Sequence, residues 1–168
     1  RIIKKVPDLQ ISFTNLPLEK YDFQIGKLAK DFYEKKFGQN IMSAQKVKEM
    51  LTDGEKSNFN VLISFQDVAH PGKGYTISYL SPNILHYSYP FYDLDHCPKD
   101  MGLAMMIKTL DYAKSKGIRY AYLGSLQRPN DTYKLQFTSG QWFDGKKWSD
   151  NMDEVKLILK QIEIDSSK

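Results

Sequence analysis

The sequence contains a single cysteine among its 168 residues, and this scarcity limits the chemistry open to it. Cys97 has no partner for an internal disulfide, and one thiol cannot build a metal site of several cysteines. Only three histidines are present, and neither His70 nor His86 has a neighbour at a metal-ligand spacing. His96 and Cys97 are adjacent, but one such pair chelates an ion poorly. The sequence therefore predicts no bound metal.

Long apolar runs are also missing. No stretch approaches the roughly 20 residues that a membrane-spanning helix needs. The opening segment RIIKKVPDL has two lysines without an apolar stretch behind them, so it is not a secretory signal. With the lone cysteine, these absences favour a reducing cytoplasm and no membrane partner. The sequence begins with Arg rather than Met, which is typical of a fragment.

The composition that is present fits a packed globular protein. Hydrophobic residues make up 41% of the chain and aromatic residues 13%, enough to build a core. We expect residues 1–168 to form one domain with its core at about 9–148, because this length suits one ordinary domain. The net charge of +4 permits an anionic partner such as RNA or a phosphate-bearing cofactor without requiring one.

Two helices are expected early in the chain. After a weak strand at about 9–14, apolar residues at helical spacing predict a helix over 18–37, which Gly38 ends. Ser43 is a good N-cap for a second, shorter helix, and the turn at Asp53 ends that helix.

Three strands follow, because the apolar pattern changes to period two. Residues 59–65 and 75–79 alternate, and 84–92 is a tyrosine-rich run behind a Ser-Pro-Asn turn. Together these runs predict an antiparallel meander. Pro90 cannot donate to a strand ladder, so it indicates a bulge or a strand end.

The chain then crosses over through a helix. An apolar stripe predicts this helix, which Gly117 closes, and a buried strand at 118–123 follows it. Strands 84–92 and 118–123 should therefore be parallel neighbours. We predict an α+β fold with a mixed, twisted sheet flanked by helices. The remaining expected elements are a helical piece at 133–137, a hairpin from Trp142 to Trp148 and a last helix at about 151–163, capped near Asp150.

The turn between strand 84–92 and the crossover helix carries the most chemistry. A glycine at a helix start lets a ligand approach the backbone, and the N–H groups of the first turn are unpaired donors. Such a turn can bind the phosphates of a cofactor, with Lys99, Met101, Gly102 and Ala104 forming the site. The alternative is an ordinary strand-to-helix turn with a solvated lysine, since this short pattern is common.

The element order and this turn resemble those of the GNAT acyltransferases. Their pyrophosphate-binding turn reads Gln/Arg-x-x-Gly-x-Gly/Ala, which Lys99, Gly102 and Ala104 match with Lys in the first place. The resemblance implies a GNAT-like fold whose fourth and fifth strands part to admit an acyl donor. Over about 59–148 the chain resembles the C-terminal domain of arginyl/leucyl-tRNA–protein transferases. The motifs that carry this are Tyr-Pro-Phe-Tyr92-Asp93, Gly102, Gly117 to Gly124, Tyr133-Lys134-x-x-Phe137 and Gly145-x-x-Trp148.

Single residues acquire candidate roles from this arrangement. Tyr133 would lie where GNAT enzymes keep a tyrosine that protonates the leaving group, although a tyrosine packed on the sheet would fit as well. Arg128, Lys134 and Tyr92 would bind the donor or its tRNA. The two basic residues would do so by holding phosphates. The alternative is that both are ordinary solvated side chains. Asp93 could accept a hydrogen bond from the acceptor amine or only form a turn.

Three functions remain open on the sequence alone. The first is an aminoacyl-tRNA-dependent aminoacyltransferase that acts on a protein or peptide amine. The second is a GNAT N-acetyltransferase that uses acetyl-CoA on a protein or small amine, and the third is a non-catalytic domain that kept the fold. The Tyr-Lys-x-x-Phe and Gly-x-x-Trp motifs favour the first over the second, whereas the absence of the family's cysteine-bearing N-terminal domain favours the third. For either donor we expect no tightly bound cofactor and direct attack by a neutral amine.

Overall fold

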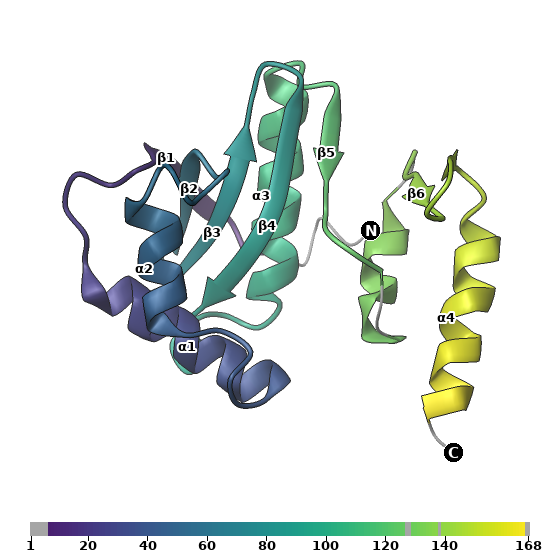
Figure 1. Cartoon of the computed structure of the whole chain (residues 1–168), viewed down its shortest axis with the longest axis horizontal. Coiled ribbons are helices and arrows are strands. Elements are labelled where there is room, and N and C mark those ends of the chain that lie inside the picture. Colours follow the sequence, from purple (N-terminus) through teal and green to yellow (C-terminus); the bar gives the residue numbers. More distant parts are fainter. Residues whose placement is uncertain (1–6, 127–128, 138, 167–168) are drawn as a thin grey trace. The chain divides into compact units, whose positions relative to one another are not determined.

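The computed structural model describes residues 7–126, 129–137 and 139–166. The chain forms two compact units, residues 1–123 and residues 124–168 (Figure 1). The predicted single domain spans both units. Of the helices described, none combines the length and the apolar character that a membrane crossing requires.

The first unit is built on a five-stranded mixed sheet with the order β1-β2-β3-β4-β5. The first four strands pair antiparallel, and β5 pairs parallel to β4 after the crossover. This confirms the predicted meander and parallel pair, and with them the α+β class and the GNAT-like element order. The strands are β1 Leu9–Asn15, β2 Val61–Asp67, β3 Lys73–Leu80, β4 Ile84–Tyr92 and β5 Tyr120–Tyr122.

Three helices flank this sheet, and two of them have side-chain caps. The predicted helix start at residue 18 is wrong, because the carboxylate of Asp22 caps the helix by accepting from the Gln24 N–H at 2.9 Å. Ser43 caps the second helix as predicted, accepting from the Lys46 N–H at 3.0 Å. Each cap satisfies a donor that the first helical turn leaves unpaired. The helices are α1 Phe23–Phe37, α2 Ala44–Thr52 and α3 Met101–Ser115.

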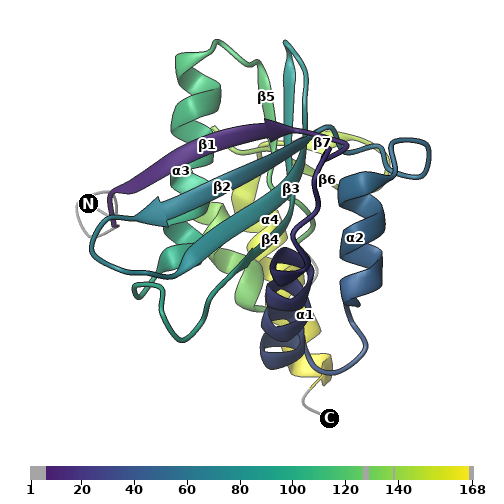
Figure 2. The same ribbon diagram turned by 90° about the vertical axis from the view of Figure 1, so that its left-hand side faces the viewer.

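The two faces of the sheet are covered differently: α1 and α2 lie on one face and α3 on the other (Figure 2). Leu62, Ile77 and Phe91 belong to the core beneath α1 and α2, and each is at most 3% exposed. On the opposite face, a Cβ at Gly74 would lie 2.7 Å from Met105 Sδ. Glycine at this position therefore lets α3 approach β3 closely.

The crossover helix ends as predicted, but the strand after it differs from the prediction. α3 buries Met101 and Met105 completely, and Gly117 behind it has a left-handed φ of 67°. The strand expected to be buried at 118–123 is only three residues long, and its Tyr120 is 45% exposed. That burial prediction is wrong because β5 is an edge strand, and β4 is its one neighbour among the strands that the structure describes.

The second unit contains a short 3₁₀ helix, a hairpin and a terminal helix. The hairpin is present where the sequence predicts it, with Gly145 at a φ of 97°. The carboxylate of Asp144 accepts from the N–H groups of Lys146 and Lys147 at 2.7 and 2.8 Å, which fixes the turn. The elements are η2 Pro129–Gln136, β6 Trp142–Phe143, β7 Trp148–Ser149 and α4 Met152–Ser166.

The terminal helix is capped one residue later than expected. The side chain of Asn151, and not that of Asp150, accepts from the Glu154 N–H at 3.3 Å. Val155 and Leu159 are buried, at 3% and 2% exposure, and α4 packs against η2. The helical spacing of these two residues made α4 predictable from the sequence.

Candidate functional site

The parallel pair of strands opens after a short contact. Ile84, Leu85 and His86 of β4 pair with the three residues of β5, and β4 then continues through Tyr92 (Figure 1). Among the described residues, β4 from residue 87 onward therefore has a strand neighbour on the β3 side only. An edge of this kind presents backbone N–H and C=O groups that a ligand can pair with.

The same stretch of β4 carries a bulge. Ile77 of β3 pairs with Tyr89 and Ser78 pairs with Tyr87, so Ser88 is an extra residue without a register partner. The bulge that Pro90 indicated thus exists two residues before the proline. Bulges re-aim the backbone and are frequent beside active sites, and here the bulge lies next to the β4–β5 opening.

The predicted phosphate-binding turn lies between β4 and α3. Two of its backbone donors are used internally: the Met101 N–H bonds the Pro98 carbonyl at 3.3 Å, and the Ala104 N–H bonds that of Asp100 at 2.9 Å. The side chains of Met101 and Ala104 are fully buried, whereas Lys99 is exposed. These contacts leave Gly102 and the residue after it as the backbone positions through which the turn can meet a ligand.

Tyr92 and Gly102 are brought together at this turn. The Tyr92 ring lies beside Gly102: a Cβ on Gly102 would lie 3.3 Å from Tyr92 Cε1 and 3.6 Å from the phenol oxygen. Burial raises the pKa of Tyr92, and nearby Cys97 and Asp100 raise it further, so the phenol keeps its proton. Its ring also packs 4.9 Å from that of Phe32 in α1, measured between centroids.

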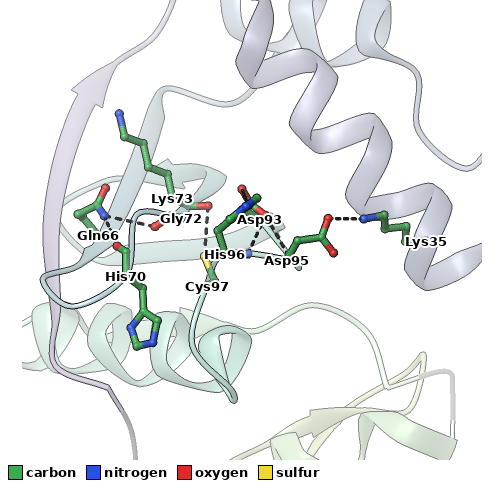
Figure 3. Close-up of polar contacts among 9 residues, drawn as sticks. All are labelled: Lys35, Gln66, His70, Gly72, Lys73, Asp93, Asp95, His96 and Cys97. Atoms are coloured by element: carbon green, nitrogen blue, oxygen red, sulfur yellow. Dashed lines mark hydrogen bonds and ion pairs between the residues drawn. The ribbon is translucent and has the colours of Figure 1, made fainter.

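Asp93 forms the turn that leads from β4 towards α3 (Figure 3). Its Oδ1 accepts from the N–H groups of Asp95 and His96 at 3.0 and 3.1 Å, and its Oδ2 lies 3.0 Å from His96 Nδ1. Burial alone would raise the pKa of Asp93, but these hydrogen bonds outweigh burial and lower it. Both oxygens are thus engaged in the turn, while a role towards the acceptor amine stays a prediction.

Cys97 lies in the same turn, and its Sγ donates to the Lys73 carbonyl at 3.7 Å. Burial raises the pKa of this thiol to about 11, with Asp93 adding to the effect. The nucleophilic form of cysteine is the thiolate, so almost none is present at neutral pH.

Alkylation of Cys97 should therefore be slow. We expect iodoacetamide at pH 8 to react roughly 10-fold or more slowly than with an exposed cysteine peptide, because the low thiolate fraction outweighs the higher intrinsic nucleophilicity. Mass spectrometry of timed samples measures this rate, with the urea-unfolded chain as the control. A native thiol as reactive as the unfolded one would contradict this description.

Titratable side chains elsewhere in the first unit form pairs rather than larger clusters. Asp67 is 8% exposed, and its Oδ1 lies 2.9 Å from His70 Nδ1, a contact that lowers the pKa of Asp67. Within the described residues, His, Cys, Asp and Glu side chains do not gather in threes or more where an ion could be held.

A polar hollow of about 320 Å³ lies on β1, β2 and β3. Across this hollow, Gln10 and Ser12 of β1 pair with Gln66 and Ser64 of β2. Ser64 pairs on its other side with Tyr75 of β3. Its lining belongs to three strands away from β5, so it is separate from the β4–β5 opening. Its residues are Gln10, Ile11, Ser12, Ser64, Phe65, Gln66, Lys73 and Tyr75.

The second unit holds the remaining predicted site residues. Tyr133 in η2 is 36% exposed, and the Lys134 ammonium lies 5.8 Å from the centroid of its ring. Lys134 Nζ also donates to the Ser125 carbonyl at 2.7 Å, so the lysine is tied to its own unit. Arg128 lies outside the described residues.

One notable residue was missed by sequence reasoning. His86 is half-buried in the last pair of the β4–β5 ladder, and burial lowers its pKa. A histidine inside the tyrosine-rich strand, four residues before Pro90, was the available signal.

Comparison with known proteins gives partial relatives. No family model matches the chain. Aspartate/glutamate leucyltransferases from two strains of Stenotrophomonas maltophilia are 29% identical to it over 69 residues and 30% identical over 64 residues. The matches cover 40% and 37% of this chain, and they span only 28% and 26% of those proteins.

Solved structures with a related arrangement are distant in sequence. An integron cassette protein from Vibrio cholerae has a TM-score of 0.49 at 13% identity, with 88% of this chain and 97% of that chain covered. A ribosomal-protein-alanine N-acetyltransferase from Brucella melitensis biovar Abortus has a TM-score of 0.48 at 12% identity, with coverages of 84% and 97%. A possible acetyltransferase from Clostridium difficile has a TM-score of 0.49 at 12% identity, with coverages of 82% and 96%.

Proposed function

We propose that the chain is an acyltransferase whose acyl donor lies in the opening between β4 and β5. The observation that carries this is the strand pair itself, which holds for three residue pairs and then parts where β4 is bulged at Ser88. An extended donor can pair with the free edge of β4 much as a missing strand would.

Transfer at such a site needs positioning and charge stabilisation more than a nucleophilic side chain. The acceptor nitrogen bonds to the acyl carbon, and the ester or thioester bond of the donor breaks. The amine loses one proton, and the leaving oxygen or sulfur gains one. Backbone N–H groups of the bulged strand would polarise the carbonyl, and the protonated thiol of Cys97 takes no part. The GNAT resemblance implies Tyr133 as the group that gives the leaving atom its proton.

The finer proposal is that the donor is an aminoacyl-tRNA, with leucine as the first candidate amino acid. It is supported by the similarity to aspartate/glutamate leucyltransferases and by a net charge of +4, which suits RNA. The acceptor would be the α-amine of a protein or peptide that begins with Asp or Glu, as the name of those relatives indicates for them. N-acetylation from acetyl-CoA is the second candidate, favoured by the match of the Lys99–Gly102–Ala104 pattern to the GNAT pyrophosphate turn.

A transfer assay tests this proposal. The chain is incubated with radiolabelled leucyl-tRNA or acetyl-CoA and with a peptide that begins with Asp, and an N-terminally blocked copy of that peptide is the matched control. We expect label from leucyl-tRNA on the free amine and none on the blocked peptide. Label from acetyl-CoA alone would favour the second candidate, and a folded chain that transfers from neither donor would overturn the acyltransferase proposal.

Donor binding should depend on Gly102. In Gly102→Val the new Cβ would lie 3.3 Å from Tyr92 Cε1, and the larger side chain would fill the approach to the first-turn N–H groups. We expect the Kd for the donor to rise about tenfold or more, which corresponds to about 1.4 kcal/mol of lost contact. Titration calorimetry measures the Kd, and a thermal melt checks folding. Unchanged affinity in a folded variant would contradict a donor site at this turn.

A further inference from the structure

His86 lies at the point where β4 and β5 part. It is the last β4 residue in the parallel ladder, paired with Tyr122 of β5 and with Tyr79 of β3. Its ring meets that of Tyr122 edge-on, at 6.1 Å between centroids and 72° between planes. Ser88, the bulge residue, donates its hydroxyl to the His86 carbonyl at 3.4 Å, so the histidine adjoins both the opening and the bulge.

The imidazole projects from the sheet face opposite α3. Tyr87, the next residue of β4, is 2% exposed and pairs with Ser78 of β3. Ser78 lies on the same face of β3 as Gly74, and that face is the one packed against α3. Side chains alternate along a strand, so His86 points to the other face, on which α1 and α2 lie. Leu85 and Tyr87 are buried on the α3 face, so His86 is the side chain of this stretch that faces the other way.

The three histidines of the chain differ in their partners. His70 and His96 each place Nδ1 within 3.0 Å of an aspartate carboxylate, at Asp67 and Asp93. Neither ring nitrogen of His86 bonds another of the described residues, although the ring is half-buried. A half-buried polar group without a protein partner is available to a ligand.

We propose that His86 is the base that accepts the proton of the attacking amine. The proposal rests on acyl transfer at the β4–β5 opening as the function. The acceptor enters as an ammonium ion, one N–H proton passes to an imidazole nitrogen, and the freed lone pair bonds to the acyl carbon. The imidazolium returns that proton to solvent after the product leaves, so no further reactant is needed.

The surroundings of His86 suit this task. The titratable side chains that flank it in register are tyrosines, Tyr79 and Tyr122, and burial is the cause that lowers its pKa. The imidazole is therefore neutral at pH 7, whereas an α-ammonium group with a pKa of about 8 is mostly charged there. A neutral base beside a mostly protonated nucleophile gives the site a reactive amine at neutral pH.

The test compares pH profiles of His86→Gln with those of the unaltered chain, in the transfer assay with leucyl-tRNA or acetyl-CoA. We expect H86Q to lose about 10²-fold in kcat/KM at pH 6.5. Its activity should then rise with pH as the amine deprotonates without help, so the deficit shrinks towards pH 9. The unaltered chain should be nearly flat between pH 7 and pH 8. His70→Gln, which removes an exposed imidazole outside the opening, is the matched control and should keep the flat profile.

The outcomes separate this inference from the proposed function. A folded H86Q with an unchanged rate and profile overturns the role of His86 and leaves the acyltransferase proposal standing. An unaltered chain that transfers from neither donor overturns the function and the role of His86 with it. If H86Q does not fold, an NMR titration of the unaltered chain decides: an imidazole that stays protonated at pH 7 overturns the proposal, and a neutral one supports it.

Discussion

Replacing Gly72 by alanine should destabilise the first unit by about 3 kcal/mol, at the upper end of what overpacking costs. A Cβ at this position would lie 2.6 Å from the carbonyl carbon of His96 and 2.7 Å from both the backbone N and the Sγ of Cys97. Two of these atoms are backbone, so no side-chain rotation relieves the clash. The Gly72 N–H also bonds the His96 carbonyl at 3.2 Å, which holds the β2–β3 loop against the turn before α3.

Thermal unfolding measures this effect. A loss of about 3 kcal/mol corresponds to a Tm lower by roughly 6–12 °C in a chain of this size. Gly54→Ala is the matched control, because the nearest atom to its new Cβ, Pro17 Cδ, is at an ordinary 3.6 Å. We expect G54A to change stability by less than about 1 kcal/mol. Equal melting points for the two variants would show that the loop and the turn are not packed as described.

Removing the hydroxyl of Tyr133 is expected to slow transfer by about 10²-fold, if protonation of the leaving group limits the rate. The ribose oxygen of an aminoacyl-tRNA is a poor leaving group without a proton, and a phenol can donate one. Tyr133 is 36% exposed, so Tyr133→Phe removes one oxygen from a partly solvated ring and should leave the melting temperature nearly unchanged.

Steady-state kinetics with saturating donor measures this prediction. Tyr112→Phe is the control, because that ring packs 4.1 Å from Phe13 of β1, between centroids, and has no proposed part in the chemistry. The loss in Y133F should fall on kcat rather than on KM. A fully active Y133F would mean that another group or water protonates the leaving group, and the role carried over from the GNAT resemblance would be wrong.

Local patterns in the sequence were enough for most of the fold. The bounds of β4, the cap at Ser43 and the parallel pair with β5 all follow from period, capping and crossover rules that act over short stretches. The start of α1 was missed because Tyr21 and Leu18 have helical spacing but pack against the core from the preceding loop. Apolar spacing reports which side chains are buried and does not by itself say where the helix begins.

The site was less predictable, because its contacts join residues distant in the sequence. The sequence motif located Gly102, but the position of the Tyr92 ring beside it depends on how β4 leads into α3. A turn at Asp93 was foreseen as an alternative, and its hydrogen bonds to Asp95 and His96 are local. The half-burial of His86 depends on register with β5, and no pattern within one strand shows that register.

The most direct test of the donor site is an amide NMR titration of the chain with acetyl-CoA and with a non-hydrolysable leucyl ester mimic of a CCA end. We predict that at least one of the two shifts the amide signals of Tyr87, Ser88 and Tyr89 in β4 and of Gly102 at the start of α3. Signals around the polar hollow at Ser12 and Ser64 should stay in place. Shifts confined to that hollow, or no shifts with either compound at saturating concentration, would contradict an acyl donor between β4 and β5.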